Sequence, residues 1–298
     1  RSVSKFQITE PGGDVAPHTF LVLYFVTMRK ILILALLSLS LGACHKTEPA
    51  DAGMVTAYIF HMASDLDEID VLIYSDPMAD PSRCRAFLND WQIPGEWFRN
   101  TYGAVYLGVL VTGLDLQPGY IAQLDVESDV GSSEGSLNMP NTLSFVSHAD
   151  SDTVAVADLT VSWTRAEGAD FHDFWVGITG YTPSGTKLGE RYIYFFTKDT
   201  SYTLPRDSIV FPGNYGYSEI LFDIDPCAGV MPEPGARTNM TGDLVGNFYL
   251  INTTSPTLFL YAGTPARASA GNPPGRGAQG YSSKEDFRTR AERALGLR

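Results

Sequence analysis

The sequence predicts an all-β protein built from two tandem antiparallel β-sandwich domains. Runs rich in β-branched and aromatic residues recur about every 8–12 residues between residues 54 and 262, separated by turn residues. Over the same stretch, no apolar pattern keeps the i, i+3, i+4, i+7 spacing of a helix for three turns. The body expected at residues 47–266 has 220 residues, enough for two domains of about 100 residues each.

Residues 28–43 have the layout of a secretory signal. Arg29 and Lys30 precede an almost unbroken aliphatic run at residues 31–41. The apolar stretch is shorter than the roughly 20 residues of a bilayer-spanning helix. Extending it backwards would bury both basic residues at a cost of several kcal/mol. Polar residues follow it directly, which argues against a buried core helix. We therefore predict an export signal.

The signal ends in small residues and a cysteine, in the order Leu41, Gly42, Ala43, Cys44. This ending resembles the lipobox of bacterial lipoproteins, in which the cysteine is lipidated and becomes the first residue of the mature chain. The resemblance implies a membrane anchor at Cys44 and a location in the cell envelope. In many proteobacterial lipoproteins an Asp after the cysteine retains the protein at the inner membrane. His45 stands there in this chain, so the outer membrane is favoured where the cell has one.

Two short segments flank the signal. Because the chain begins with Arg1 and a Met stands at position 28, residues 1–27 are expected to be translated from upstream of the true start. Residues 44–53 are expected to form a polar tether between the lipid and the body.

The first sandwich is predicted over residues 54–148. Strands are expected at residues 54–60, 69–74, 105–111, 120–126 and 143–146, a hairpin at 85–93 and a turn at 129–135. A short helix could lie within residues 81–100. Pro118 and Gly119 predict a tight turn, because proline presets φ and glycine supplies a positive φ at the next position.

The order of motifs in this region resembles small sandwiches related to transthyretin and the carboxypeptidase regulatory domain. The residues that carry the resemblance are Ala86–Asp90, Tyr102, Leu116, Pro118, Gly119 and Ala122. They cover less than half of the first domain, and the resemblance implies the fold alone.

The second sandwich is predicted over residues 149–262. Its strands are expected at residues 158–163, 174–179, 191–196, 208–211, 218–224, 247–251 and 257–261. The spacing resembles the B and C strands of fibronectin type III domains, and is carried by Leu159, Val161, Trp163, Gly168, Ala169, Asp170, Phe174, Val176 and Ile178. The resemblance implies that Trp163 fills the space between two sheets. The long connection at residues 226–246 departs from it.

Residues 263–298 are rich in Gly, Ala, Pro and Arg, a composition typical of disorder, with a short helix expected within residues 282–297. This tail carries a net charge of +4. The tail either lies on the acidic body or, like residues 1–27, is translated from sequence outside the true protein.

Charge excludes one class of partner. The body contains 9 Lys and Arg against 29 Asp and Glu, a net charge of −20. Such a field repels phosphates, so nucleic acid is excluded as a partner. Cations, basic proteins and neutral glycans remain possible partners. Alternatively, the acidic surface only keeps the protein soluble. Cys84 and Cys227 are expected as isolated thiols or as a bridge between domains, and no Cys/His pattern predicts zinc.

Catalytic motifs are weak. Residues 131–135 match G-x-S-x-G, but no strand runs into a helix there, so we predict a hairpin loop rather than a nucleophile elbow. His172, between Asp170 and Asp173, is interpreted as part of a strand-connecting turn. The acidic residues at 65–70, and Asp223 with Asp225, raise calcium as an alternative to exposed acidic loops, although the EF-hand pattern is missing.

Aromatic residues give the strongest binding signal. In residues 191–196, Tyr192 and Tyr194 alternate with apolar residues, so one set is expected to face the core and the other water or a ligand. Trp91 and Trp97 lie on a predicted loop. The alternative is that both groups close the core or the junction between domains.

The sequence therefore predicts a membrane-anchored envelope lipoprotein that is not an enzyme and needs no cofactor. It would act as a binding, adhesion or structural module for a glycan or an envelope protein. The rival hypothesis is an envelope enzyme acting on glycans or peptides, or its carbohydrate-binding accessory part, with two carboxylates as acid and base.

Overall fold

The computed structural model describes residues 53–62, 66–100, 103–264, 289 and 291–293. The predicted signal, lipobox and Cys44 lie outside these residues, as does most of the predicted tail. The described part belongs to one compact unit, residues 51–298. It is an all-β sandwich protein, as the sequence predicts. Among the described residues, no helix is long and apolar enough to cross a membrane.

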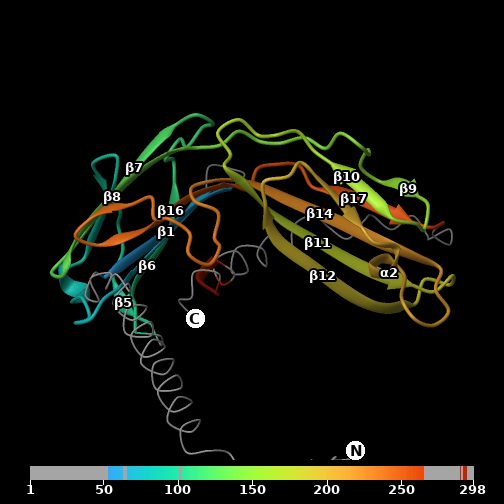
Figure 1. The fold of residues 1–298 in the computed structure, drawn as a ribbon, viewed down its shortest axis with the longest axis horizontal. Helices are drawn as coiled ribbons and strands as arrows, with labels where there is room; N and C mark the ends of the chain where they lie inside the picture. Colours follow the sequence, from blue (N-terminus) through green and yellow to red (C-terminus); the bar gives the residue numbers. More distant parts are fainter. Residues whose placement is uncertain (1–52, 63–65, 101–102, 265–288, 290, 294–298) are drawn as a thin grey trace, which may run out of the picture. The chain divides into compact units, whose positions relative to one another are not determined.

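A ten-stranded sheet runs through both halves of this unit in the order β12-β11-β14-β16-β1-β2-β6-β5, with β17 beside β14 and β9 beside β17 (Figure 1). Its strands are β1 (Met54–Met62), β2 (Leu66–Tyr74), β5 (Phe98–Arg99), β6 (Val105–Thr112), β9 (Asp152–Val154), β11 (Phe171–Tyr181), β12 (Lys187–Thr197), β14 (Tyr217–Ala228), β16 (Val245–Asn252) and β17 (Leu258–Ala262).

Two smaller sheets complete the sandwiches. The five-stranded sheet has the order β15-β8-β7-β3-β4 and consists of β3 (Arg85–Leu88), β4 (Trp91–Gln92), β7 (Ile121–Ser128), β8 (Gly131–Asn138) and β15 (Thr241–Gly242). The two-stranded sheet pairs β10 (Leu159–Ser162) with β13 (Ser201–Leu204). The described helical turns outside the tail are η1 (Pro81–Arg83) and α2 (Arg206–Ile209).

Each half has its own hydrophobic core. The first core joins inward residues of the five-stranded sheet, such as Leu124 and Val126, to Val55 and Phe248 of the large sheet. The second core lies between β10–β13 and β11, β14 and β17, and Trp163 fills it with only 3% of its surface exposed. The inward position of Trp163 matches the expectation for a residue between two sheets.

The predicted membership of residues 247–251 in the second sandwich is wrong. They belong to β16, which pairs in parallel with β1 over eight residues, from Met54–Val245 to His61–Asn252. β16 joins β14 at only two positions, Cys227 with Ile251 and Ala228 with Leu250. The long connection after β14 therefore returns the chain to the first core. β9 and β17 also pair in parallel, so not every pairing is antiparallel as predicted.

Local turn chemistry is predicted well where proline, glycine and asparagine set it. Asn89 and Asp90 have φ values of 48° and 63° in the β3–β4 hairpin, the left-handed conformation of a type I′ turn. At the Pro118–Gly119 turn, the Tyr120 amide donates to the Gln117 carbonyl at 2.9 Å. The predicted hairpin and tight turn are therefore confirmed.

Three local predictions are wrong. Residues 131–135 form the start of β8 and not a loop, because the turn is confined to residues 129–130 and Gly131 already pairs with Ser128. Residues 208–211 lie largely in α2 and the segment after it, not in a strand. Residues 143–146 contribute an isolated bridge, Phe145 with Trp163, in place of a strand.

A third apolar cluster lies on the opposite side of the large sheet from the two cores. Tyr58, Phe171, Cys227 and Tyr249 belong to it, together with Ala291 from the helical residues 289 and 291–293. The predicted short helix near the C-terminus is confirmed at those four residues. Ala291 is fully buried, so this segment packs on the body.

Candidate ligand-binding face

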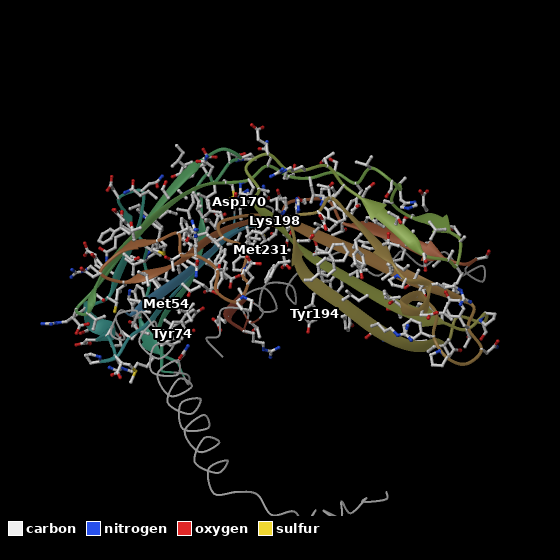
Figure 2. All side chains as sticks on the ribbon, in the orientation of Figure 1. Met54, Tyr74, Asp170, Tyr194, Lys198 and Met231 are labelled. Atoms are coloured by element: carbon white, nitrogen blue, oxygen red, sulfur yellow. The ribbon has the colours of Figure 1, made fainter. Side chains whose placement is uncertain are left out.

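Strand β12 divides its residues between the core and water. Ile193 and Phe195 pack against the second core, whereas Tyr192 and Tyr194 are 56% and 47% exposed. The period of two along a strand explains this split. Figure 2 shows the Tyr194 side chain at the surface of this sheet. The predicted alternation of the two residue sets is confirmed, and a ligand-facing role for both tyrosines remains a prediction.

The neighbouring strand adds an indole to the same face. Trp175 stands directly opposite Tyr194 across the β11–β12 pair, and its ring stacks on Tyr192 with centroids 5.8 Å apart and planes 29° apart. The next outward position on β11 is Gly177. A Cβ at Gly177 would lie 2.5 Å from the indole, so the ring occupies the space that a side chain would fill. We call Trp175, Tyr192 and Tyr194 the aromatic face.

A short polar network holds Tyr192. Its hydroxyl donates to Glu190 at 2.9 Å, and Lys187 also donates to that carboxylate. The hydrogen bonds from Lys187 and Tyr192 lower the pKa of Glu190, and donating its hydrogen bond to Glu190 raises the pKa of the Tyr192 phenol. Tyr192 therefore keeps its proton at neutral pH, and its ring is held beside Trp175.

Asp223 completes the row on the other side of the indole. It lies on β14 directly opposite Trp175, and burial raises its pKa to about 6. No hydrogen-bond donor among the described residues reaches its carboxyl group. The aromatic face therefore borders a half-buried acid that can accept a hydrogen bond from a ligand, a feature that the sequence pattern at Asp223 and Asp225 did not assign to any ring.

The far end of the same sheet is closed by internal contacts. Tyr181 stacks on Tyr217 at 4.9 Å and donates its hydroxyl to Glu219 at 3.0 Å. Burial, with this hydrogen bond to Glu219, raises the pKa of Tyr181. These tyrosines are engaged with their own neighbours, so the most exposed rings of the sheet are Tyr192 and Tyr194 of β12.

The two predicted tryptophans do not join this face. Trp91 is 40% exposed on β4, an edge strand of the five-stranded sheet, whereas Trp97 packs against the first core. Neither contacts β12. The structure therefore separates the four aromatic candidates into an exposed pair on β12, one isolated surface ring and one core ring.

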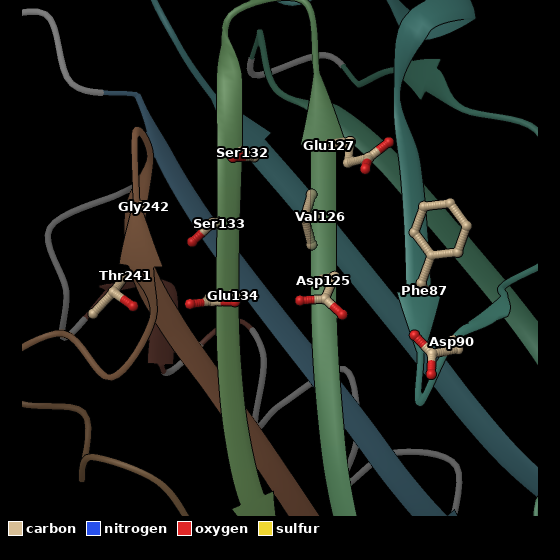
Figure 3. A pocket seen from close by; sticks show the side chains of 10 residues that line it. All are labelled: Phe87, Asp90, Asp125, Val126, Glu127, Ser132, Ser133, Glu134, Thr241 and Gly242. Carbon is tan, nitrogen blue, oxygen red and sulfur yellow. The ribbon is translucent and has the colours of Figure 1, made fainter.

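The outward surface of the five-stranded sheet carries mainly carboxylates, together with the ring of Phe87. Asp125 and Glu134 stand directly opposite each other on β7 and β8. Figure 3 shows them with Glu127, Asp90 and Phe87. These residues line an open hollow with a volume of about 580 Å³. We call this surface the acidic hollow. Ser133 of the G-x-S-x-G match also lines it, but β8 does not lead into a helix, so no nucleophile elbow is formed.

The remaining candidates are separated by strand geometry. His172 lies buried in β11, edge-on to Trp163, and not in a turn as predicted; burial lowers its pKa. Asp67 and Asp70 lie in β2 on opposite sides of the sheet, where Asp67 bonds His61 at 2.8 Å and Asp70 accepts from Tyr106. In the part of the chain that the structure describes, no three acidic, His or Cys side chains converge to hold a metal ion.

Cys84 and Cys227 are both buried, and among the described residues neither forms a disulfide bond. Cys84 belongs to the first core and Cys227 to the cluster on the other side of the large sheet. Burial raises the pKa of the Cys84 thiol to about 11, so it stays protonated and unreactive at neutral pH. Of the two expected arrangements, the isolated thiols are the one observed.

The sequence reasoning missed Trp175 and Asp223 as parts of one surface. The outward direction of Trp175 could be predicted from the sequence, because Trp175 alternates with the core residues Phe174, Val176 and Ile178. The strands that pair with β11 could not be predicted from the sequence. Only the register of β11 against both β12 and β14 places the indole between Tyr194 and Asp223.

Comparisons with known proteins add little to this description. No protein-family model matches the chain, and a search of curated proteins found no match. Among solved structures, the chain is similar to a pilus backbone protein of Streptococcus pneumoniae, at 9% sequence identity and a TM-score of 0.13. The match covers 70% of this chain, which spans 59% of that protein. A similarity this low carries no functional argument.

Proposed function

We propose that this protein is a lipid-anchored, non-catalytic binding module of the bacterial cell envelope, placed at the outer membrane where the cell has one. Residues 28–43 support export, and the residues before Cys44 support lipidation. The all-β body would then stand in the envelope on the tether of residues 44–53.

The observation that carries the binding role is the aromatic face. Tyr192 and Tyr194 leave about half of each side chain in water beside the Trp175 ring, although β12 has core positions available to aromatic residues. Leaving apolar ring surface in water forgoes about 25 cal/mol for each Å². Contiguous exposed rings therefore mark a surface that a ligand or partner covers.

Charge supports the choice of ligands. The excess of acidic residues in the body repels anionic lipids and nucleic acids. An uncharged glycan or an envelope protein with a neutral or basic surface suits this field. The acidic hollow is the less suitable surface for these ligands, because its opposed carboxylates Asp125 and Glu134 repel each other.

The anchor is tested by fractionating cells that express the full chain and its Cys44→Ser variant. We expect the native chain in the membrane pellet with an acyl mass on its N-terminal cysteine, and the variant unacylated. The matched control is His45→Ala, which keeps the cysteine and should remain acylated. An unmodified thiol and an uncut N-terminus in the native chain would overturn the anchor.

The binding role is tested by the retention of the purified, detergent-solubilised full chain on isolated cell envelope. We expect retention by the native chain and its loss in the Tyr192→Ala/Tyr194→Ala double variant. Trp91→Ala, on a different sheet, should be retained like the native chain. Equal retention of the double variant, or no retention of the native chain, would contradict a binding role for the aromatic face.

A further inference from the structure

Trp175 and Tyr192 of the aromatic face stack on each other and do not form a box. Trp175 and Tyr192 are near-parallel, at 29°, and their centroids are 5.8 Å apart. Rings that bind an organic cation by cation–π contacts work best when they surround the charge on several sides. The two near-parallel rings, of which Tyr192 is exposed and Trp175 is partly exposed, instead offer apolar surface to a flat ligand.

Hydrogen-bond acceptors border this surface on both sides. Asp223 lies beside Trp175 on β14, with no described donor at its carboxyl group. Glu190 lies beyond Tyr192 and already accepts from its hydroxyl. A ligand that suits this arrangement has an apolar face for the rings and donors around its rim for the acids.

A pyranose ring has this combination. One face presents C–H groups that pack on aromatic rings, and its edge presents hydroxyl groups that donate to carboxylates. Asp223 and Glu219 lie on β14, on the other side of β11 from the ion pair of Lys187 and Glu190, and their carboxyl groups disfavour sugars that carry carboxylates, sulfates or phosphates. The charge of the face therefore narrows the ligand to an uncharged sugar.

We propose that Trp175, Tyr192 and Asp223 form a subsite for an uncharged, pyranose-containing oligosaccharide. The sugar ring stacks on the indole and the phenol, and a hydroxyl group at its edge donates to the Asp223 carboxyl. The proposal rests on the proposed function, because it assigns a ligand class to the same face. Gly177 contributes to the subsite because it has no side chain, which leaves room for the indole of Trp175 to lie beside Tyr192.

The test is a titration of the full chain, in a detergent without a sugar headgroup, with neutral oligosaccharides of β-linked glucose and of N-acetylglucosamine. Tryptophan fluorescence and calorimetry report binding. We expect saturable binding of at least one of the two, weakened at least about tenfold by Trp175→Ala and by Tyr192→Ala. Asp223→Asn should weaken it by a smaller factor, since an amide oxygen still accepts a hydrogen bond.

Two controls make the result specific. Trp91→Ala keeps three of the four tryptophans and the whole aromatic face, so its affinity should equal that of the native chain. An oligogalacturonate and choline replace the neutral sugar in parallel titrations. No binding of either neutral oligosaccharide, binding unchanged in both ring variants, or binding of choline or the acidic sugar in their place would each overturn the subsite.

The proposed function can survive this failure. If retention on the envelope depends on Tyr192 and Tyr194 while neither neutral oligosaccharide binds, the ligand is an envelope protein and the saccharide subsite is wrong. If the sugar binds through Trp175 but the envelope retains nothing, the subsite stands and the envelope role is contradicted.

Discussion

The outward surfaces of two sheets in this chain differ in chemistry although both are built from alternating strands. On the five-stranded sheet, Asp125, Glu127 and Glu134 face water around the acidic hollow. On β11 and β12, Tyr192 and Tyr194 are exposed to water and Trp175 is partly exposed. Carboxylates are well solvated there and need no partner, whereas exposed rings lose stability unless something covers them. The comparison shows that exposure alone does not mark a site, and that the type of exposed residue does.

Substitutions in the two hydrophobic cores behind these surfaces should have the largest effects on stability. Phe248 and Phe174 are fully buried, in the first and second core respectively. Replacing either by Ala should lower the free energy of unfolding by about 3–5 kcal/mol, because a buried ring is lost and a cavity remains. Denaturant titration measures this. Ile121→Ala, on an exposed side chain, is the control; a cost below about 1 kcal/mol for Phe248 or Phe174 would show that its half lacks a packed core.

Asp223 gives the next effect and distinguishes its environment from that of the acidic hollow. Its pKa is about 6 when folded and about 3.8 in the unfolded chain. Between these values the folded state binds more protons, so this group makes stability fall as the pH rises through about 4 to 6. Asp223→Asn should therefore raise the free energy of unfolding at pH 7.5 by at most about 3 kcal/mol, with little change at pH 3.5.

The measurement is the difference in unfolding free energy between variant and native chain at the two pH values. Asp125→Asn, at a partly exposed carboxyl group of the acidic hollow, is the matched carboxyl-to-amide control. A pH-independent difference for Asp223→Asn would mean that burial does not hold its proton.

Gly177→Ala separates the position of the indole from the stability of the sheet. The new Cβ would lie 2.5 Å from the far edge of the Trp175 ring, so the ring must shift. Because the ring is at the surface and can turn away, the stability cost should stay below about 1 kcal/mol. Sugar affinity and tryptophan emission should both change. Ser136→Ala, at an exposed position of β8, is the control for binding. An unchanged emission spectrum would contradict the described ring position.

The smallest effect is expected on the acidic hollow. Glu134→Gln removes one member of the like-charged pair with Asp125 and should stabilise the protein by about 0.2–1 kcal/mol. The gain should shrink in 1 M salt, where charges are screened within about 3 Å. Ser136→Ala, two residues further on the same side of β8, is the control. Destabilisation by Glu134→Gln would indicate that the pair holds something other than solvent.

Much of the fold could be predicted because it depends on local patterns. The alternation in residues 191–196 placed Tyr192 and Tyr194 outside, and Asn89 and Gly119 fixed two turns through their left-handed backbone conformation. The failures were also local. In residues 131–135, serines and glycines indicate a loop, yet β7 and β15 supply hydrogen-bond partners on both sides and hold them in a strand.

The candidate site was predicted only in half. Its two tyrosines were predicted from the two-residue period of a strand, whereas Trp91 and Trp97 were grouped with them by residue type alone. In the structure, Trp91 lies on β4 and Trp97 packs against the first core, so neither belongs to β12. The acidic residues at positions 67 and 70 looked like one cluster because they are close in sequence. A strand sends residues an odd number apart to opposite sides, and this divides them.

The sequence by itself determined the all-β class, the inward and outward direction of each side chain along a strand, and the chemistry of the segment before Cys44. These follow from the nearest neighbours in the chain. Tertiary structure alone decided that β16 returns to β1 and that Trp175 stands between Tyr194 and Asp223. Strand pairing joins residues distant in sequence through backbone hydrogen bonds that are the same for every residue type, so the side-chain pattern cannot specify the partner.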